Sequence, residues 1–373
     1  METTVIKLDQ QSSLDDVVER AADGLIRGNL VAFPTETVYG VGARADLEEA
    51  LRRLRIVKGR EPDRAFTLHI AEPDDALRYA PSLPGMARRL IRKAWPGPLT
   101  LIVEVESSGR TTGAAGMGTS TVSAIYYGNT VGMRCPDDRV TSAILRRVGA
   151  PVVAASANLA GNPAPVCGED VLNELRGRID LLVDSGRTKY AKPSTIVHIA
   201  GSTYKVLREG VYDAGIVERM TKVRILFVCT GNTCRSPMAE GLAKRALADR
   251  LGCDPSELPA HGIEVSSAGT AGGWGGASEH AMAVMEQRGI KLTDHVSQSL
   301  SAERVQQADH IFVMTEGHKS AVLAIEPSAA DRVQLLVDGR SVHDPMGGTQ
   351  KEYEQCARMI EEGLNQRLQE VIV

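Results

Sequence analysis

Residues 223–237 read VRILFVCTGNTCRSP, a largely apolar stretch followed by a short polar loop and the start of a helix. The apolar part is typical of a buried strand in a parallel sheet. In the loop, five residues separate Cys229 from Arg235. A loop of this length can wrap an oxyanion, with backbone N–H groups and the helix N-terminus directed at one centre, which favours a thiolate. The sequence therefore predicts a nucleophile at Cys229 and a guanidinium at Arg235 that binds two phosphoryl oxygens.

A second motif lies near the C-terminal end, where Asp344 and Pro345 follow His343. Together with the loop, this motif resembles the low-molecular-weight protein tyrosine phosphatase family, from about Lys222 to the end of the chain. The resemblance implies that Asp344 protonates the leaving oxygen or nitrogen when Cys229 attacks phosphorus. Asp344 would then act as base toward the water that hydrolyses the phosphocysteine. The resemblance also implies supporting positions in the loop at Thr230, Asn232, Cys234 and Ser236. It further implies a reversible disulfide between Cys234 and Cys229.

Two substrates stay open for this half of the chain. Thr230 directly after the nucleophile, the string CTGNTCRSPMAE and the Asp-Pro-x-Gly-Gly motif resemble the bacterial protein arginine phosphatases. Trp274, by contrast, is aromatic as in the phosphotyrosine enzymes, and Met346 stands where the arginine phosphatases often have Phe. Arsenate reduction on this fold needs two further cysteines downstream, and the sequence has none between Cys253 and Cys356.

The N-terminal half carries a different set of motifs. PTETVYG at 34–40 follows an apolar stretch, at the kind of strand end where α/β sheets bind ligands. The other motifs are IVKGR at 56–60, WPGPLTL at 95–101, TVGMRCP at 130–136, ASANLAG at 155–161, PSTIV at 193–197 and LREG at 207–210. Together they resemble the YrdC family over about residues 10–212.

The resemblance implies a threonylcarbamoyl-AMP synthase, which condenses L-threonine, bicarbonate and ATP and releases pyrophosphate. Its product is the intermediate for threonylcarbamoyladenosine in tRNA, so tRNA and the tRNA threonylcarbamoyl transfer machinery are expected partners. The residues implied for ATP are Lys58, Arg60, Thr130, Ser156, Asn158, Ser194 and Arg208. Those implied for threonine are Thr35, His69 and Arg134. ATP is expected as a substrate with Mg²⁺, without a tightly bound cofactor or a metal site.

The predicted fold class is α/β, with a YrdC-like twisted sheet domain followed by a four-stranded, parallel, doubly wound phosphatase domain. We place the first domain at 1–212, a linker at 213–221 and the phosphatase domain at 222–373. In the first domain we expect strands at 30–33, 66–70, 99–105, 152–155 and 195–199, and helices at 14–27, 46–57, 84–94, 139–148 and 168–177. In the second we expect strands at 223–228, 263–267, 310–314 and 333–335, and helices at 236–251, 277–288, 317–325 and 349–370.

Composition sets limits on these interpretations. The chain has 373 residues, 43% of them hydrophobic and 24% charged, as in ordinary globular proteins. No apolar run reaches the roughly 18 residues of a membrane span, and the six cysteines are too sparse for a disulfide framework. We therefore expect a cytoplasmic protein without a membrane partner. Residues 1–212 hold 27 basic and 25 acidic side chains, with local basic clusters such as Arg52-Arg53-Arg55. An RNA-binding module without synthase activity is thus an alternative for this half.

Overall fold

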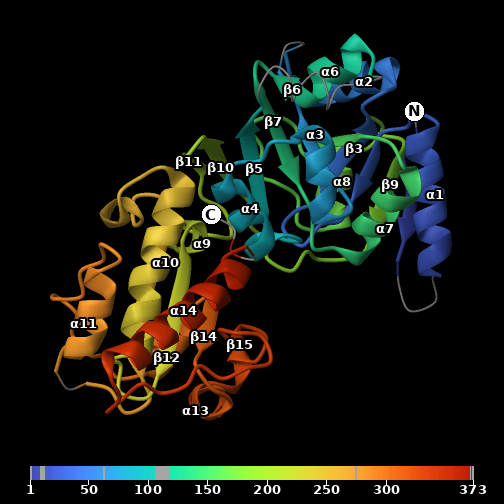
Figure 1. Cartoon of the computed structure of the whole chain (residues 1–373). Coiled ribbons are helices and arrows are strands. Elements are labelled where there is room, and N and C mark those ends of the chain that lie inside the picture. Colours follow the sequence, from blue (N-terminus) through green and yellow to red (C-terminus); the bar gives the residue numbers. More distant parts are fainter. Residues whose placement is uncertain are drawn as a thin grey trace. The chain divides into compact units, whose positions relative to one another are not determined.

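The computed structural model describes residues 2–8, 13–61, 64–105, 117–273, 275–369 and 371. Contacts between Cα atoms divide the chain into two compact units, Met1–Thr221 and Lys222–Val373, called unit 1 and unit 2 below. Figure 1 shows both units, each a sheet with helices packed on it. No helix in these described ranges combines the length and the apolar character needed to cross a membrane.

Unit 1 is built on one mixed sheet with strand order β1-β9-β2-β3-β8-β4-β7-β5-β10-β11, and β6 pairs with β7. The strands are β1 (Thr4–Lys7), β2 (Val31–Phe33), β3 (Gly40–Arg44), β4 (Thr67–His69), β5 (Leu99–Glu104), β6 (Tyr126–Tyr127), β7 (Thr130–Arg134), β8 (Val152–Ser156), β9 (Leu181–Asp184), β10 (Thr195–Ala200) and β11 (Thr203–Arg208). β3 runs antiparallel to both β2 and β8, whereas β4 runs parallel to β7 and β5 parallel to β10. Polar strand ends from distant parts of the sequence therefore meet on this sheet.

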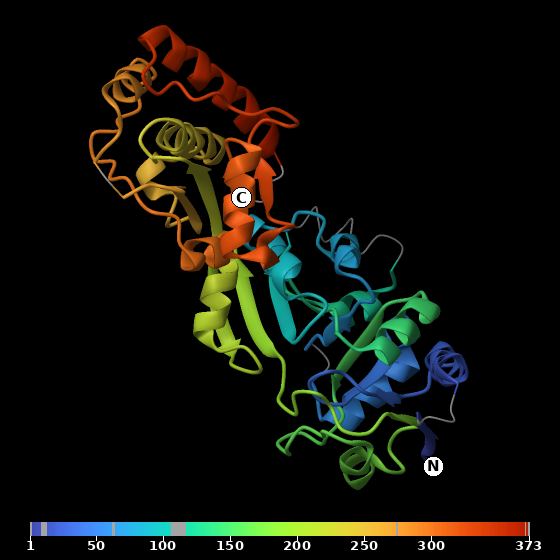
Figure 2. The ribbon, with the colours of Figure 1, turned by 90° about the horizontal axis from the view of Figure 1, so that it is seen from below.

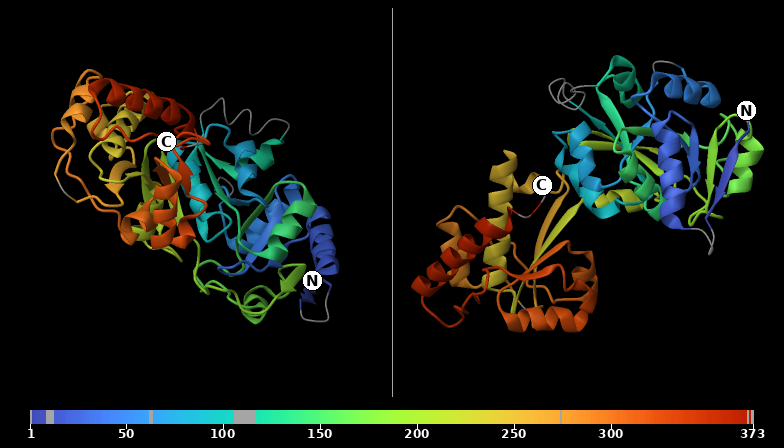
Figure 3. Two further views of the ribbon diagram at one scale, coloured as in Figure 1. Left: turned by 60° about the horizontal axis from the view of Figure 1, so that its bottom comes forward. Right: turned by 90° about the vertical axis from the view of Figure 1, so that its right-hand side faces the viewer.

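Helices cover both faces of this sheet. They are α1 (Leu14–Ile26), α2 (Glu48–Lys58), α3 (Ala76–Tyr79), α4 (Gly85–Ala94), α6 (Thr119–Ile125), α7 (Arg139–Val148), α8 (Gly168–Leu175) and α9 (Ala214–Thr221), with a 3-10 turn at Pro73–Asp75. α1 and α7 lie side by side and bury Val17, Leu25 and Ile144 against one face (Figure 3). A second core contains Leu51, Leu54, Leu90 and further residues of α2, α4, α6 and α8.

Unit 2 has a four-stranded, fully parallel sheet in the described residues, in the order β13-β12-β14-β15. The strands are β12 (Val223–Cys229), β13 (Ile263–Gly269), β14 (His310–Val313) and β15 (Val333–Leu335). The helices are α10 (Arg235–Leu251), α11 (Glu279–Glu286), α12 (Ala302–Gln307), α13 (Glu316–Ile325) and α14 (Gln350–Arg367), with 3-10 turns at Pro255–Glu257 and Pro327–Ala329. This is the predicted doubly wound fold.

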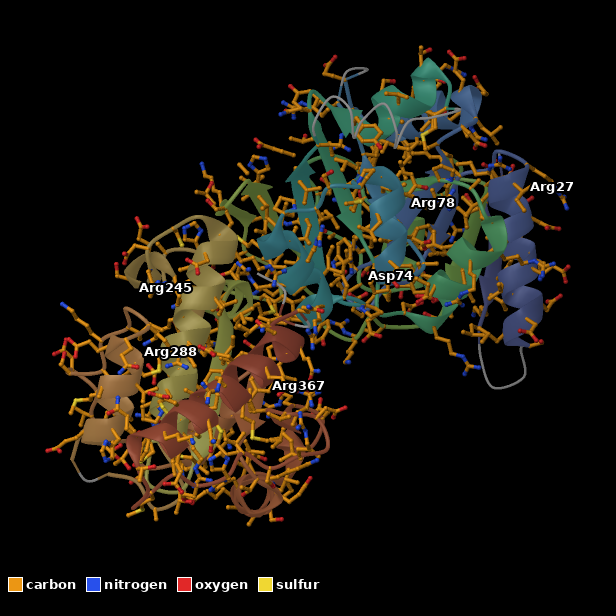
Figure 4. All side chains as sticks on the ribbon, viewed as in Figure 1. Arg27, Asp74, Arg78, Arg245, Arg288 and Arg367 are labelled. Atoms are coloured by element: carbon orange, nitrogen blue, oxygen red, sulfur yellow. The ribbon has the colours of Figure 1, made fainter. Side chains whose placement is uncertain are left out.

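Two separate apolar cores show that the sheet of unit 2 is covered on both faces. α10, α11 and α14 bury side chains such as Met238, Val284 and Ile360 against one face. α12 and α13 bury Val305 and Val322 against the other, and Figure 2 shows α10 and α14 on one side of β12 and α13 on the other. Figure 4 labels Arg288, which joins the end of α11 to α14 through an ion pair with Glu361 (2.9 Å).

The segment predicted as a linker is not irregular. Residues 214–221 form α9, which packs on α4 and buries Val217 in the core of unit 1. The side chain of Asp213 accepts the N–H of Ile216 (2.8 Å) and so satisfies a free donor at the helix start. The sequence prediction also missed six strands of unit 1, namely β1, β3, β6, β7, β9 and β11.

Candidate active sites

The loop between β12 and α10 surrounds the sulfur of Cys229. The backbone N–H of Asn232 donates to Cys229 Sγ (3.2 Å), and Ser236 Oγ lies 2.9 Å from the same sulfur. Helix α10 begins at Arg235, one residue before the predicted start at 236. Polar hydrogens and a helix N-terminus thus face the predicted nucleophile, which suits a negatively charged sulfur.

Asn232 holds this loop together from inside. It is fully buried and adopts a left-handed backbone conformation with φ 52°. Its Nδ2 donates to Ser236 Oγ (2.9 Å) and to Ser267 Oγ (2.8 Å), and its Oδ1 accepts the N–H of Gln298 (2.7 Å). Gly269 is required beside the loop, because a Cβ there would lie 2.5 Å from the carbonyl oxygen of Thr230. The shape of the loop is therefore set by contacts from β13 and from the segment after α11.

Arg235 and Asp344 lie on the cavity beside the loop. Arg235 is 4% exposed, and its Nη2 forms an ion pair with Oδ2 of Asp344, whose side chain is 44% exposed. Arg235 Nη1 also donates to the carbonyl oxygen of Val342 (3.3 Å). The cavity has a volume of about 280 Å³, and its lining includes Cys229 and Asp344. The structure thus brings together the sulfur, the guanidinium and the carboxyl group that the sequence motifs named.

Thr230 and Cys234 also line this cavity, and each contacts a residue that the sequence did not single out. Thr230 Oγ1 lies 2.9 Å from Nε2 of His318, a buried residue of α13. Cys234 Sγ lies 3.2 Å from the hydroxyl of Tyr353, whose pKa is raised to about 12 by burial and by the bond to this sulfur. Cys229 and Cys234 are free thiols, and their predicted disulfide stays a prediction.

Two further residues bear on the choice of substrate in unit 2. Met346 lines the cavity with 78% of its surface exposed, so it stands at the rim. Trp274 lies outside the described residues.

Unit 1 contains a separate cavity of about 330 Å³, formed where β3, β4, β8 and β10 approach the end of α2. Most of the residues predicted for ATP and threonine line it, namely Thr35, Lys58, Arg60, His69, Arg134, Ser156, Ser194 and Arg208. Thr100, which the sequence analysis did not single out, lies on the same wall, with its Oγ1 2.9 Å from Ser194 Oγ.

Cationic side chains occupy one part of this cavity. Lys58 Nζ donates to the carbonyl oxygen of Ser156 (2.7 Å), and burial lowers its pKa to about 8. Arg208 donates to the carbonyl oxygen of Ser194 (2.8 Å), and the guanidinium of Arg60 lies 4.7 Å from the centre of the Phe66 ring. Burial also lowers the pKa of both arginines. Clustered, partly desolvated cations beside hydroxyl groups suit a polyphosphate.

The remaining part of the cavity combines a buried ion pair with a neutral ring. Arg134 Nη2 lies 3.0 Å from Oε1 of Glu36 and donates to Thr37 Oγ1 (2.7 Å) and, at 3.4 Å, to Thr35 Oγ1. Burial lowers the pKa of His69 to about 3, so its ring is neutral near pH 7. A guanidinium, hydroxyls and a neutral imidazole can bind both charged ends and the hydroxyl of a small amino acid.

Two predicted ATP residues do not belong to the described lining of the cavity. Asn158 contacts two of the lining residues, since its Oδ1 lies 2.6 Å from Ser156 Oγ and 3.2 Å from Lys58 Nζ. Thr130 begins β7, and its hydroxyl donates to the carbonyl oxygen of Tyr127 (2.8 Å). Arg134 is four residues further along the same strand, which separates the two residues by roughly 13 Å. The assignment of Thr130 to ATP stays a prediction.

Comparisons with known proteins divide the chain in the same way. Residues 24–210 match the Sua5/YciO/YrdC family, described as telomere recombination, and residues 224–372 match the low molecular weight phosphotyrosine protein phosphatase family. A threonylcarbamoyl-AMP synthase of Bacillus subtilis (strain 168) is 37% identical over 205 residues, which are 54% of this chain and 56% of that protein. A protein-arginine-phosphatase of Geobacillus stearothermophilus is 40% identical over 154 residues, which are 39% of this chain and 94% of that protein.

A crystal structure of P. abyssi Sua5 complexed with L-threonine matches the fold with a TM-score of 0.51 at 20% identity, over 97% of this chain and 98% of that one. The chain spans only 56% and 64% of the length of two synthases that it matches, from Bacillus subtilis and Pyrococcus abyssi.

Proposed function

The chain belongs to the Sua5/YciO/YrdC family in its first unit and to the low molecular weight phosphotyrosine protein phosphatase family in its second, and from this we propose a bifunctional enzyme. Unit 1 forms L-threonylcarbamoyl-AMP from L-threonine, bicarbonate and ATP. Unit 2 is a cysteine-dependent protein phosphatase that acts on phosphoarginine.

The synthase proposal rests on the composition of the unit 1 cavity. Lys58, Arg60 and Arg208 would hold the phosphates of ATP, which brings its Mg²⁺ with it as a substrate complex. Thr35, His69 and Arg134 would hold threonine, whose amine condenses with bicarbonate to a carbamate and releases water. A carbamate oxygen then attacks the α-phosphorus and displaces pyrophosphate. A purely RNA-binding surface has no need for a cavity in which clustered cations lie beside a buried guanidinium, hydroxyl groups and a neutral imidazole.

Pyrophosphate release by the full chain tests this proposal. We expect release that requires ATP, threonine and bicarbonate together and that Lys58→Ala abolishes. Arg52→Ala is the matched control, since Arg52 lies on the same helix with its side chain 61% exposed. RNA binding with a steep salt dependence and no pyrophosphate release would instead support the RNA-binding alternative. Transfer to tRNA, and the cytoplasmic location expected from the sequence, stay predictions.

The phosphatase proposal rests on the arrangement of Cys229, Arg235 and Asp344 around one cavity. Cys229 Sγ attacks phosphorus while Asp344 protonates the leaving guanidine nitrogen, and a phosphocysteine forms. The bound phosphoryl group would accept hydrogen bonds from loop N–H groups and from Arg235. The bond from Arg235 would take the place of the ion pair between Arg235 and Asp344. Asp344 then removes a proton from the water that hydrolyses the phosphocysteine.

Phosphoarginine is favoured as substrate because a hydroxyl, that of Thr230, lines the cavity beside the nucleophile. A hydroxyl can hydrogen-bond the N–H groups of a phosphoguanidine, which an aryl phosphate does not offer. We expect the full chain to hydrolyse a phosphoarginine protein faster than a phosphotyrosine peptide, and Cys229→Ser to lose both activities. Cys253→Ser, outside the cavity lining, is the matched control. A preference for phosphotyrosine in the wild type would reject the arginine assignment and leave the cysteine mechanism in place.

A further inference from the structure

His318 links the unit 2 cavity to the start of α13. It is the third residue of this helix, 7% exposed, and Thr315 caps the helix by accepting the N–H of His318 at its Oγ1 (3.3 Å). The two ring nitrogens contact two different threonines. Nδ1 lies 3.0 Å from Thr315 Oγ1, and Nε2 lies 2.9 Å from Thr230 Oγ1. The ring therefore connects the capped start of α13 with the residue that follows the nucleophile.

The two contacts are compatible with a neutral ring that carries its hydrogen on Nε2. Burial lowers the pKa of His318 to about 4, with the nearby charge of Arg235 as a second cause, so the ring is neutral at pH 7. Because Thr315 Oγ1 already accepts the backbone N–H, its own hydrogen is available for Nδ1. On this basis we assign the ring hydrogen to Nε2, which donates it to Thr230 Oγ1.

Thr230 is left with a defined hydrogen-bonding orientation. In this tautomer its oxygen accepts a hydrogen bond from His318 and, at 3.3 Å, one from Arg235 Nη2, and the two bonds occupy both lone pairs. When a phosphoryl group engages Arg235, one lone pair becomes free while the bond from His318 persists. Thr230 then presents an acceptor to an N–H of a phosphoguanidine, and an aryl leaving group has no such hydrogen.

We propose that His318 is a positioning residue that orients the Thr230 hydroxyl and thereby makes unit 2 prefer phosphoguanidines over aryl phosphates. This inference rests on the proposed phosphoarginine phosphatase activity. Its signature is a change in the ratio of two activities, because a general distortion of the phosphate loop would lower both together.

The test compares kcat/KM for a phosphoarginine protein and for p-nitrophenyl phosphate, with the full chain. His318→Phe keeps a planar ring and removes the donor, so we expect the ratio to fall roughly tenfold, the loss associated with one neutral hydrogen bond. His318→Gln keeps an N–H donor of similar reach and is expected to restore most of the ratio. His318→Asn, whose amide is too short to reach Thr230, provides a second loss variant should the Phe variant not fold.

A double-mutant cycle with Thr230→Val isolates the contact. In the Thr230→Val background, His318→Phe is expected to change the ratio by less than about twofold, because the hydroxyl that His318 orients is gone. An unchanged ratio in His318→Phe, a shift that persists without the Thr230 hydroxyl, or a Gln variant as impaired as Phe overturns the inference. A wild type that cleaves p-nitrophenyl phosphate but not phosphoarginine overturns the proposed function and this inference with it. A wild type that prefers phosphoarginine with a ratio insensitive to His318 overturns this inference alone.

Discussion

Replacing Asn232 is expected to destabilise unit 2 by an amount that its contacts define. Asn232→Ala removes three side-chain hydrogen bonds, to Ser236, Ser267 and Gln298, and places a Cβ-bearing residue without a polar side chain at φ 52°. Asn232→Gly removes the same hydrogen bonds but tolerates the left-handed backbone. The difference between the two variants therefore measures the backbone contribution alone.

The expected loss follows from the number of these bonds. At about 1 kcal/mol of net stabilisation for each bond, the glycine variant loses about 3 kcal/mol. The left-handed conformation adds about 1 kcal/mol for alanine, giving about 4 kcal/mol in total. For a unit of this size these values correspond to a fall in Tm of roughly 6–12 °C and 8–16 °C.

Calorimetry of the full chain measures these shifts, and the transition of unit 2 is identified by the simultaneous loss of phosphatase activity. Thr233→Ala in the same loop is the control, since its hydroxyl makes only a 3.6 Å contact with Cys234 Sγ. An alanine variant as stable as the glycine variant would show that the backbone conformation costs little. A loss below about 1 kcal/mol in both variants would refute the role given to the buried amide.

Three further changes have defined outcomes. Because the pKa of Lys58 is lowered to about 8, its ammonium loses its proton as pH rises through that value, so ATP affinity measured by titration calorimetry should weaken between about pH 7 and pH 9. Lys58→Arg should make the ATP affinity independent of pH over this range. If the affinity of Lys58→Arg fell with pH as much as that of the wild type, this explanation would be wrong. Glu36→Gln leaves the buried guanidinium of Arg134 without its counter-charge and should lower the stability of unit 1 by about 3 kcal/mol in thermal unfolding, whereas an unchanged Tm would show that the pair is solvated. Thr230→Ile should lower kcat/KM for phosphoarginine peptides and spare that for phosphotyrosine peptides, and an equal loss for both would refute a specific role for the hydroxyl.

The phosphate loop of unit 2 could be predicted from the sequence because its geometry is local. Cys229 and Arg235 lie in one strand–loop–helix segment, so their order already places them around one centre. Asp344 is 109 positions from Arg235, and only the family motif connected the two. The sequence did not indicate that His318 contacts Thr230, since a single histidine in a helix has the same sequence pattern whether it packs in a core or contacts a loop.

In unit 1, the sequence predicted most of the residues that line the cavity but missed several strands and the helix α9. The segment of β3 contains Gly40 and Gly42, which lower its apparent strand propensity, although it is buried between β2 and β8. The helix at 214–221 contains Gly215 and was read as a linker, because the packing of Val217 on unit 1 is not visible in a short segment. Thr130 and Arg134 belong to one motif, but only Arg134 lines the cavity, because the motif extends along the whole of β7.

The central claim is that each unit carries its own reaction, with the residues of its own cavity. The most direct test measures pyrophosphate release and phosphoarginine hydrolysis in the same preparations of the full chain, of Lys58→Ala and of Cys229→Ser. We predict that Lys58→Ala loses only pyrophosphate release and that Cys229→Ser loses only phosphoarginine hydrolysis. Loss of both activities in either folded variant, or the absence of either activity from the wild type, would contradict the claim.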